Sequence, residues 1–155
     1  MRQIGLRDQS GTEDAAIGRL MYDAIHNGPS QYTAAQRQAW LATPNDSPAW
    51  SERLAAQHVV VAREAGELQG VMTLQKDYID LAYVAAAAQG QGLFRVLFGA
   101  IEAQARASWQ PRLWTHASLM AQPAFRAMGF HVIRHETVAR AGQELARAEM
   151  EKKWQ

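Results

Sequence analysis

The chain has 155 residues, a length typical of one domain with its own hydrophobic core. Lys and Arg number 16 against 15 Asp and Glu, and this formal net charge of +1 argues against nucleic acid and a membrane surface as partners. The absence of cysteine excludes disulfides, thiolate metal ligands and a cysteine nucleophile.

The start of the chain gives a first strand and no targeting signal. Residues 1–4 (Met-Arg-Gln-Ile) do not resemble a signal peptide, and no apolar run reaches the roughly 18 residues of a membrane span. We therefore expect a cytoplasmic protein. Residues 2–7, with Ile4 and Leu6 apolar, predict a short strand.

The N-terminal third is otherwise predicted to be helical. Ser10 with Glu13 matches a capping box ahead of an amphipathic helix that ends near Ile25. Thr33 with Gln36 repeats this pattern for a helix reaching residue 41. A third short helical piece, capped by Ser47 and with Pro48 at its first position, reaches residue 54.

Strands follow from His58 onward. Residues 59–62 and 68–74 predict two strands joined by a hairpin turn at 64–67. Residues 78–84 predict a third strand by alternation. If that strand is regular, Tyr78 and Asp80 share one face, whereas Tyr83 lies on the other.

The stretch Gln89-Gly90-Gln91-Gly92 separates the 78–84 strand from an amphipathic helix that continues to about residue 107. A glycine loop at a helix N-terminus exposes unpaired N–H groups to an anion, so the pattern predicts a phosphate site. A P-loop lysine and the third glycine of a dinucleotide fingerprint are both missing. The alternative is a plain glycine turn between a core strand and a core helix.

The C-terminal part predicts a strand at 112–117, a short helix at 123–128 closed by Gly129, and a hairpin of strands at 131–140 and 144–153. The whole chain, residues 1–155, thus predicts a single mixed α/β domain in the order β-α-α-β-β-β-α-β-α-β-β.

Two motifs within this order resemble those of the GNAT N-acetyltransferase family. Residues 89–94 resemble motif A (Q/R-x-x-G-x-G/A), with Phe94 in place of the final small residue. Residues 118–130 resemble N-x-x-A-x-x-x-Y-x-x-x-G-F, with Ser118 at the Asn place and Phe125 at the Tyr place. The segments 78–80 and 117–118, together with Phe125, more closely resemble the small bacterial YafP-like branch. The resemblance implies a central mixed, mostly antiparallel sheet flanked by helices.

The resemblance also implies that acetyl-CoA is the cofactor. Its pyrophosphate is expected on the backbone of the motif A loop, Arg95 adds charge or is a solvated helix residue, and Val84 pairs with the pantetheine arm. The residues expected to bind the cofactor are Val84, Gln89, Gly90, Gln91, Gly92, Leu93, Phe94, Arg95, Ser118 and Phe125. No metal-ligand spacing is found among the histidines at 26, 58, 131 and 135.

For catalysis, the family chemistry is direct attack of an amine on the acetyl thioester, which needs a base. Asp80 is the candidate base, with a structural ion pair as the equal alternative. The usual acid, a Tyr, is replaced by Phe125, so water or Tyr83 is the expected substitute. His116, at the end of the 112–117 strand, is a further candidate, although such a histidine is more often packed in the core.

The resemblance places the acceptor pocket under the N-terminal helices and the last hairpin. Tyr32, Trp40, Trp50 and Tyr78 are expected to line it, with simple packing as the alternative for the aromatic residues. We expect a small-molecule amine as substrate; peptide or protein acceptors remain an alternative, as does a catalytically weak acyl-CoA-binding module. A homodimer is an expectation that the sequence leaves open.

Overall fold

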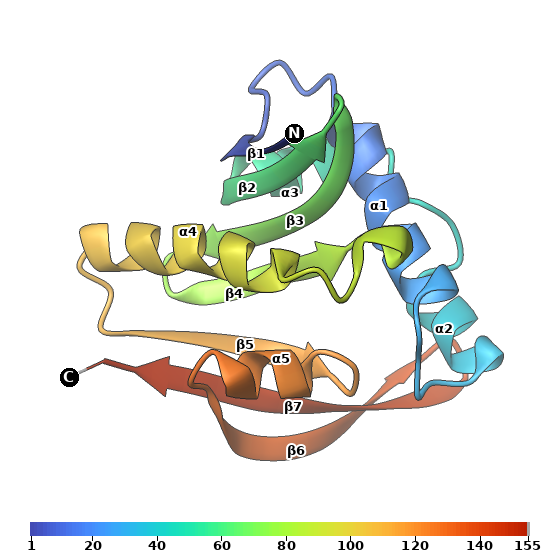
Figure 1. Cartoon of the computed structure of the whole chain (residues 1–155). Helices are drawn as coiled ribbons and strands as arrows, with labels where there is room; N and C mark the ends of the chain where they lie inside the picture. The colour runs from blue at the N-terminus through green and yellow to red at the C-terminus, as the bar shows by residue number, and fades with distance from the viewer. Residues whose placement is uncertain (155) are drawn as a thin grey trace.

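The computed structural model describes residues 1–154 and contains one seven-stranded sheet with helices on both faces (Figure 1). The strand order is β1-β2-β3-β4-β5-β7-β6, and all neighbours are antiparallel except β4 and β5. This arrangement confirms the predicted fold class, a mixed and mostly antiparallel sheet flanked by helices.

The elements follow the predicted order with one more helix between the first two strands, because the short piece after Ser47 is a full helix. Their bounds are β1 Arg2–Leu6, α1 Asp14–Asn27, α2 Ala34–Trp40, α3 Pro48–Ala55, β2 His58–Glu64, β3 Glu67–Gln75, β4 Tyr78–Val84, a 3₁₀ turn Ala86–Ala88, α4 Leu93–Ala107, β5 Arg112–Ser118, α5 Gln122–Ala127, β6 His131–Arg140 and β7 Gln143–Lys153.

Side-chain alternation along β2 divides the core into two layers. Val59 and Val61 pack on the side of α1 and α3, with Ile17, Leu54 and Trp50 among their cluster. Val60 and Ala62 point to the opposite side, where the apolar face of α4 packs. Each face of the sheet is therefore buried by its own helices, α4 on one face and α1 with α3 on the other.

Two of the three predicted helix caps are confirmed. Gln36 N donates to Thr33 Oγ1 at 3.0 Å and Thr33 N donates to Gln36 Oε1 at 2.8 Å, which is a complete capping box for α2. Ser47 accepts from the backbone N–H of Trp50 at the start of α3.

The predicted cap at Ser10 is wrong. The Ser10 hydroxyl donates to Asp8 Oδ1 at 2.7 Å, and α1 begins only at Asp14. Glu13, the expected partner of Ser10, forms an ion pair with Arg63 on β2 instead. A local pattern was therefore overridden by an ion pair between Glu13 and a residue 50 positions away in the sequence.

Candidate active site

The central feature of the site is the separation of β4 from β5. The two strands pair only at their starts, Tyr78 with Trp114 and Ile79 with Thr115. Thr115 Oγ1 donates to the carbonyl of Ile79 at 2.9 Å at the last paired position. Beyond this point the two parallel strands no longer pair, and two cavities lie where the sheet has opened.

A bulge in β4 sets the side chains that face these cavities. Met72 pairs with Ala82 but Leu74 pairs with Ile79, so β4 carries one extra residue, and Leu81 N donates to Thr73 Oγ1 at 3.0 Å there. β4 is therefore not a regular strand, and its bulge reverses the alternation, so Tyr83 lies on the same face as Asp80 and not on the opposite face, where a regular strand would place it. Asp80 and Tyr83 line one cavity together.

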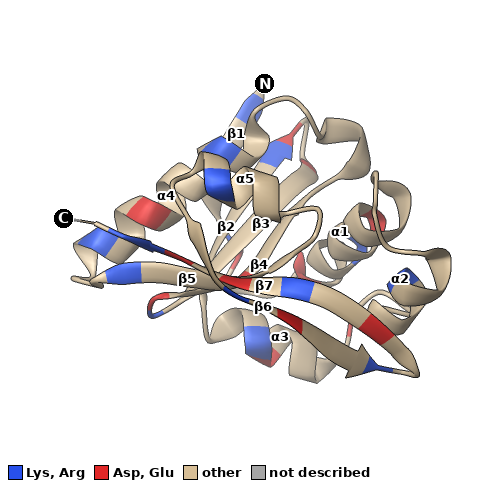
Figure 2. Cartoon of the chain, turned by 90° about the horizontal axis from the view of Figure 1, so that it is seen from below, with Lys and Arg blue, Asp and Glu red and all other residues tan. Residues whose placement is uncertain are grey.

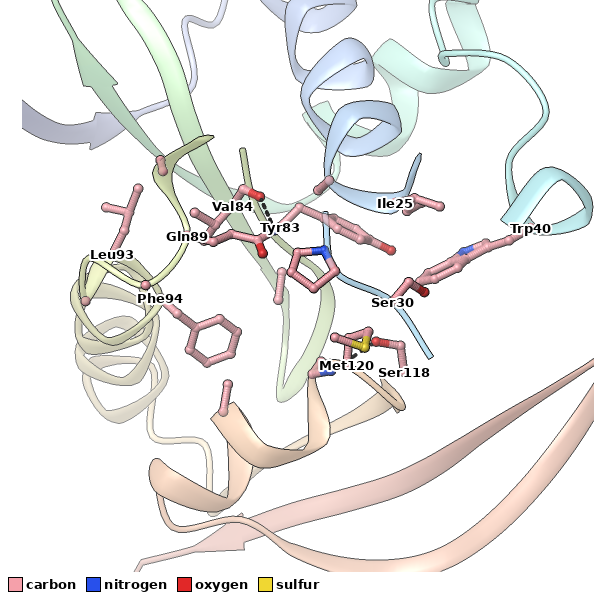
Figure 3. A pocket seen from close by; sticks show the side chains of 18 residues that line it. Ile25, Ser30, Trp40, Tyr83, Val84, Gln89, Leu93, Phe94, Ser118 and Met120 are labelled. Atoms are coloured by element: carbon pink, nitrogen blue, oxygen red, sulfur yellow. Dashed lines mark hydrogen bonds between the residues drawn. The ribbon is translucent and has the colours of Figure 1, made fainter. Parts of the chain in front are cut away.

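The first cavity, of about 340 Å³, lies between the motif A loop and α5 (Figure 3). Gly90 and Gly92 have φ values of +79° and +78°, which glycine adopts without strain. Gly92 is the N-cap of α4 and no side chain caps this end, so the first N–H groups of the helix are available to a ligand. A left-handed glycine loop at an uncapped helix N-terminus fits a pyrophosphate.

Most of the residues predicted to bind the cofactor line this cavity. They are Val84, Gln89, Gly90, Gly92, Leu93, Phe94 and Ser118. Gln89 Nε2 donates to the carbonyl of Val84 at 3.1 Å, so this side chain occupies the carbonyl expected to pair with the pantetheine arm (Figure 3). The carbonyl of Val84 can accept a second hydrogen bond, so an arm that binds there would share it with Gln89 or displace this side chain.

Three members of the predicted set lie outside the lining. Gln91 and Arg95 are exposed at the start of α4. Phe125 is only 1% exposed and its ring packs edge-on against Phe94 and Phe130, with centroids 5.1 and 5.0 Å apart. Phe125 therefore packs in the core behind the cavity wall. On α5 and at its N-cap, the residues that line the cavity are Ala124 and Ala121.

One wall of the cavity was missed by sequence analysis. The end of α1 and the segment after it supply lining residues, and so does the turn before α5; these are Ala24, Ile25, Pro29, Ser30 and Met120. Gly28-Pro29 marks the end of a helix in the sequence, but no sequence signal shows that this end packs against the glycine loop.

The second cavity, of about 280 Å³, is polar and lies between the N-terminal helices and the β6–β7 hairpin. Trp40, Tyr83 and Ser118 line both cavities, so the two meet at these residues. Tyr32, Trp40 and Tyr78, three of the residues expected to line an acceptor pocket, line the second cavity. Trp50 does not: it is 3% exposed, belongs to the core and donates its indole N–H to the carbonyl of Asp14 at 2.8 Å.

Asp80 is held in an ion pair at the floor of the second cavity. Arg53 Nε and Nη2 donate to its two carboxylate oxygens at 2.8 and 2.9 Å, and Gln57 Nε2 donates to Oδ2 at 2.7 Å. Burial raises the pKa of Asp80, but the hydrogen bonds from Arg53 and Gln57 outweigh it and lower that pKa below its usual value. At neutral pH the side chain of Asp80 is therefore ionised, and its oxygens are already hydrogen-bonded to Arg53 and Gln57.

Tyr78 and His116 form a second polar pair. Tyr78 Oη lies 2.9 Å from His116 Nδ1, and both residues line the second cavity. Burial, together with the charge of Arg147, lowers the pKa of His116, so its imidazole is neutral at pH 7. Burial raises the pKa of the Tyr83 hydroxyl, which therefore keeps its proton.

Among residues 1–154, His116 also meets Glu136 and Glu149 in a group whose potential ligand atoms all lie within 4.8 Å of one another. Both carboxylates already have cationic partners: Arg147 Nε donates to Glu136 at 2.6 Å, and Arg134 Nη2 lies 3.5 Å from Glu149. These arginines supply the positive charge that a cation would bring, and we assign the group as an ion-pair network.

Comparison with known proteins places this site in a family. A model of the acetyltransferase (GNAT) domain matches residues 29–153. No protein in a set of curated sequences matches the chain significantly. In the part of the chain that the structure describes, no helix is both long and apolar enough to cross a membrane.

Solved structures share the fold over nearly the whole chain. A GCN5-related N-acetyltransferase from Rhodopseudomonas palustris, also named aminotransferase class-II, is 26% identical with a TM-score of 0.87, covering 99% of this chain and 96% of its own. The putative acetyltransferase yncA from Salmonella typhimurium, solved with its cofactor acetyl-CoA, is 19% identical (TM-score 0.68; 99% and 94% covered). The ribosomal-protein-S18-alanine N-acetyltransferase from Escherichia coli is 14% identical (TM-score 0.73; 99% and 94%).

Three observations support the same family assignment. The sheet opens between β4 and β5, a glycine loop precedes the uncapped end of α4, and the family model matches residues 29–153. The chain belongs to the GNAT family and is an acetyltransferase.

Proposed function

We propose that the enzyme acetylates the primary amine of a small molecule by direct attack of that amine on the thioester. The observation that carries this proposal is the junction of the two cavities at Trp40, Tyr83 and Ser118. A cofactor arm in the first cavity and an acceptor in the second would meet there. The second cavity, at about 280 Å³, is near the lower end of the range for small-ligand sites.

Bound acetyl-CoA supplies the acetyl group as an activated thioester. The protein's own contribution begins with the α4 end, whose N–H groups hold the phosphates. Phe94 and Leu93 shield the loop side of the cavity, and Ser118 offers a hydroxyl at the junction. These contacts orient the reacting groups, which is a large part of the catalysis of a bimolecular transfer.

We assign the removal of the acceptor proton to His116. An alkylamine has a pKa near 10.4 and arrives charged, so a base has to take its proton at neutral pH. His116 is neutral there, lines the acceptor cavity and is oriented by Tyr78 through the 2.9 Å hydrogen bond. Asp80 is better suited to a positioning role, because its carboxylate is already bonded to Arg53 and Gln57.

We assign the donor for the departing sulfur to Tyr83. Its hydroxyl keeps its proton, and the residue lines both cavities at their junction. Phe125 has no proton to donate and lies in the core.

The YafP-like branch is a narrower proposal that is supported only by the residues at 78–80 and 117–118 and by Phe125.

The test is thiol release from acetyl-CoA with a panel of primary amines, together with peptides that carry a free N-terminus, and mass spectrometry of the products. We expect acetylation of small amines well above the rate without acceptor. Acetylation of peptides alone would overturn the small-molecule assignment. Binding of acetyl-CoA without transfer to any acceptor would instead favour an acyl-CoA-binding module.

A further inference from the structure

We propose that the acceptor carries a carboxylate in addition to its amine, and that Arg140 binds this carboxylate. The inference rests on the proposed function, since it names the class of small amine that the second cavity takes. It comes from the balance of charge in that cavity, whose lining contains three guanidinium groups, of Arg53, Arg140 and Arg147, and one carboxylate, that of Asp80.

Two of the three guanidinium groups are already neutralised by acids of the protein. Asp80 binds Arg53 through both carboxylate oxygens, and Glu136 accepts from Arg147 at 2.6 Å. Arg140 differs: within residues 1–154 it has no carboxylate partner, and its only hydrogen bond runs from Nη1 to the carbonyl of Trp40 at 3.1 Å. A guanidinium has five N–H donors, so most of those of Arg140 are available to a ligand.

The position of Arg140 suits the far end of a short acceptor. It ends β6 and reaches the last residue of α2, so it sits where the hairpin and the N-terminal helices meet across the cavity. Trp40 is a neighbour of both residues: its carbonyl accepts from Arg140, and the centroid of its ring lies 6.3 Å from that of Tyr83. An acceptor whose amine reaches the junction at Tyr83 can therefore present its other end to Arg140.

The charge of the cavity also favours an acceptor that carries a carboxylate. Figure 2 shows basic and acidic residues interspersed along β6 and β7, so the excess of guanidinium groups is local to the cavity and not a property of the whole face. An amine without an acid arrives as a cation, and the guanidinium group of Arg140, which has no carboxylate partner among the described residues, repels it. An amine with a carboxylate is a zwitterion, and guanidinium recognises carboxylate through two parallel hydrogen bonds.

The alternative is that Arg140 only caps α2. Trp40 is the last residue of that helix, and a cation near a helix C-terminus is stabilising in itself. This role predicts that the loss of Arg140 lowers the melting temperature and leaves the choice of acceptor unchanged. The two explanations therefore differ in a measurable quantity.

The experiment compares kcat/KM for pairs of acceptors that differ by a carboxylate, such as leucine with isoamylamine, phenylalanine with phenethylamine, and lysine with cadaverine. The ratio within each pair is measured for wild type, Arg140→Gln, Arg140→Lys and the control Arg19→Gln. Arg19 is exposed on α1 and lines neither cavity. Because the amines differ in their own pKa, the change of the ratio on mutation is the decisive quantity.

We expect wild type to favour the carboxylate-bearing member, and Arg140→Gln to lower the ratio about tenfold or more, as for loss of a hydrogen bond to a charged group. Arg140→Lys should lower it less, and Arg19→Gln should leave it unchanged. An unchanged ratio in a folded Arg140→Gln, or a wild-type preference for amines without a carboxylate, overturns the inference while the proposed function stands. No turnover with any amine overturns both.

Discussion

At the scale of single residues, the site contrasts two titratable groups on neighbouring strands. Asp80 on β4 is bonded to Arg53 and Gln57, and its pKa is lowered. His116 on β5 lies 2.9 Å from the Tyr78 hydroxyl through Nδ1 and 3.9 Å from Glu149 through Nε2, and burial lowers its pKa, so its imidazole is neutral at pH 7. Two groups whose environments push them toward different roles are typical of an active site. We therefore expect their substitutions to fail in different ways.

Asp80→Asn should chiefly affect stability. Arg53 is 44% exposed, so solvent screening keeps the loss in the free energy of unfolding at about 1–2 kcal/mol at pH 7. Since the folded pKa of Asp80 is lowered, this contribution is fully present above its unfolded pKa and is lost as pH falls through the folded pKa. Urea unfolding should give the same difference at pH 7 and pH 5.

The rate effect of Asp80→Asn separates positioning from base catalysis. We expect similar losses of kcat/KM for alkylamines and for arylamines, which are already neutral at pH 7. A loss of a hundredfold confined to alkylamines would instead restore Asp80 as the base.

His116→Asn should act on the chemistry. The loss of a general base is worth roughly a hundredfold or more in kcat/KM with an alkylamine. Burial lowers the pKa of His116 from its usual value of 6.5. As the pH is lowered, the imidazole becomes protonated, so the pH–rate profile of the wild type should show a decrease with its inflection below pH 6.5. This inflection should vanish in His116→Asn. Its persistence would show that another group titrates there.

Tyr83→Phe and Phe125→Tyr test the proton donor together. Tyr83→Phe should lower kcat by at least about tenfold, in the range of general acids. Phe125→Tyr should change the rate by less than about tenfold, because its ring lies in the core between Phe94 and Phe130. Its hydroxyl would be buried without a designed partner, at a cost of about 1–3 kcal/mol. A hundredfold gain from Phe125→Tyr, with melting curves that show a folded protein, would contradict this assignment.

At the scale of elements, β4, the glycine loop and α4 follow one another and together form the proposed cofactor site. Gly92 has positive φ, but there is open space on its side-chain side, where no atom lies within 4 Å of the place that a Cβ would take. Two substitutions therefore separate strain from charge. Gly92→Ala adds the strain of a left-handed residue, about 1–2 kcal/mol, and Gly92→Glu adds the same strain with a carboxylate at the phosphate site.

We expect acetyl-CoA affinity to be at least tenfold weaker in Gly92→Glu than in Gly92→Ala, a difference of about 1.4 kcal/mol. Titration calorimetry on both proteins measures it, and circular dichroism controls for folding. Equal affinities in the two variants would place the phosphates elsewhere.

At the scale of the whole molecule, the first cavity is lined from both halves of the open sheet. Val84 and the loop come from one half, and Ser118 and Ala121 from the other. The halves are paired at only two residue positions, Tyr78 with Trp114 and Ile79 with Thr115. A ligand that contacts both halves should therefore stabilise the entire domain and not only its own loop.

Acetyl-CoA at a hundred times its dissociation constant should add about 2.7 kcal/mol to stability. For a chain of this size that corresponds to a rise in melting temperature of about 5–10 °C. Differential scanning calorimetry checks this, and Gly92→Glu should lose most of the shift at the same ligand concentration. No shift in wild type at this concentration, with affinity shown independently, would mean that the domain does not unfold as one cooperative unit.

Local sequence determined most of the elements and the cofactor loop. The helical periodicity of 93–107, the Thr33–Gln36 capping box and the two glycines each rely on neighbours within one or two turns of the chain. Such local signals depend little on the packing of the rest of the molecule. This is why the bounds of α2, α3 and α4 and the position of the glycine loop were predicted closely.

Tertiary structure decided what local patterns leave open. Glu13 forms an ion pair with Arg63 and not the expected capping box with Ser10, and Trp50 lies in the core and does not line the second cavity. The bulge at Leu81, fixed by a hydrogen bond to Thr73 on β3, turned Tyr83 toward Asp80. The partners of Asp80 and Arg140 lie 27 and 100 positions away in the chain. Pairing across such distances depends on three-dimensional packing, which the periodicity of one strand does not encode.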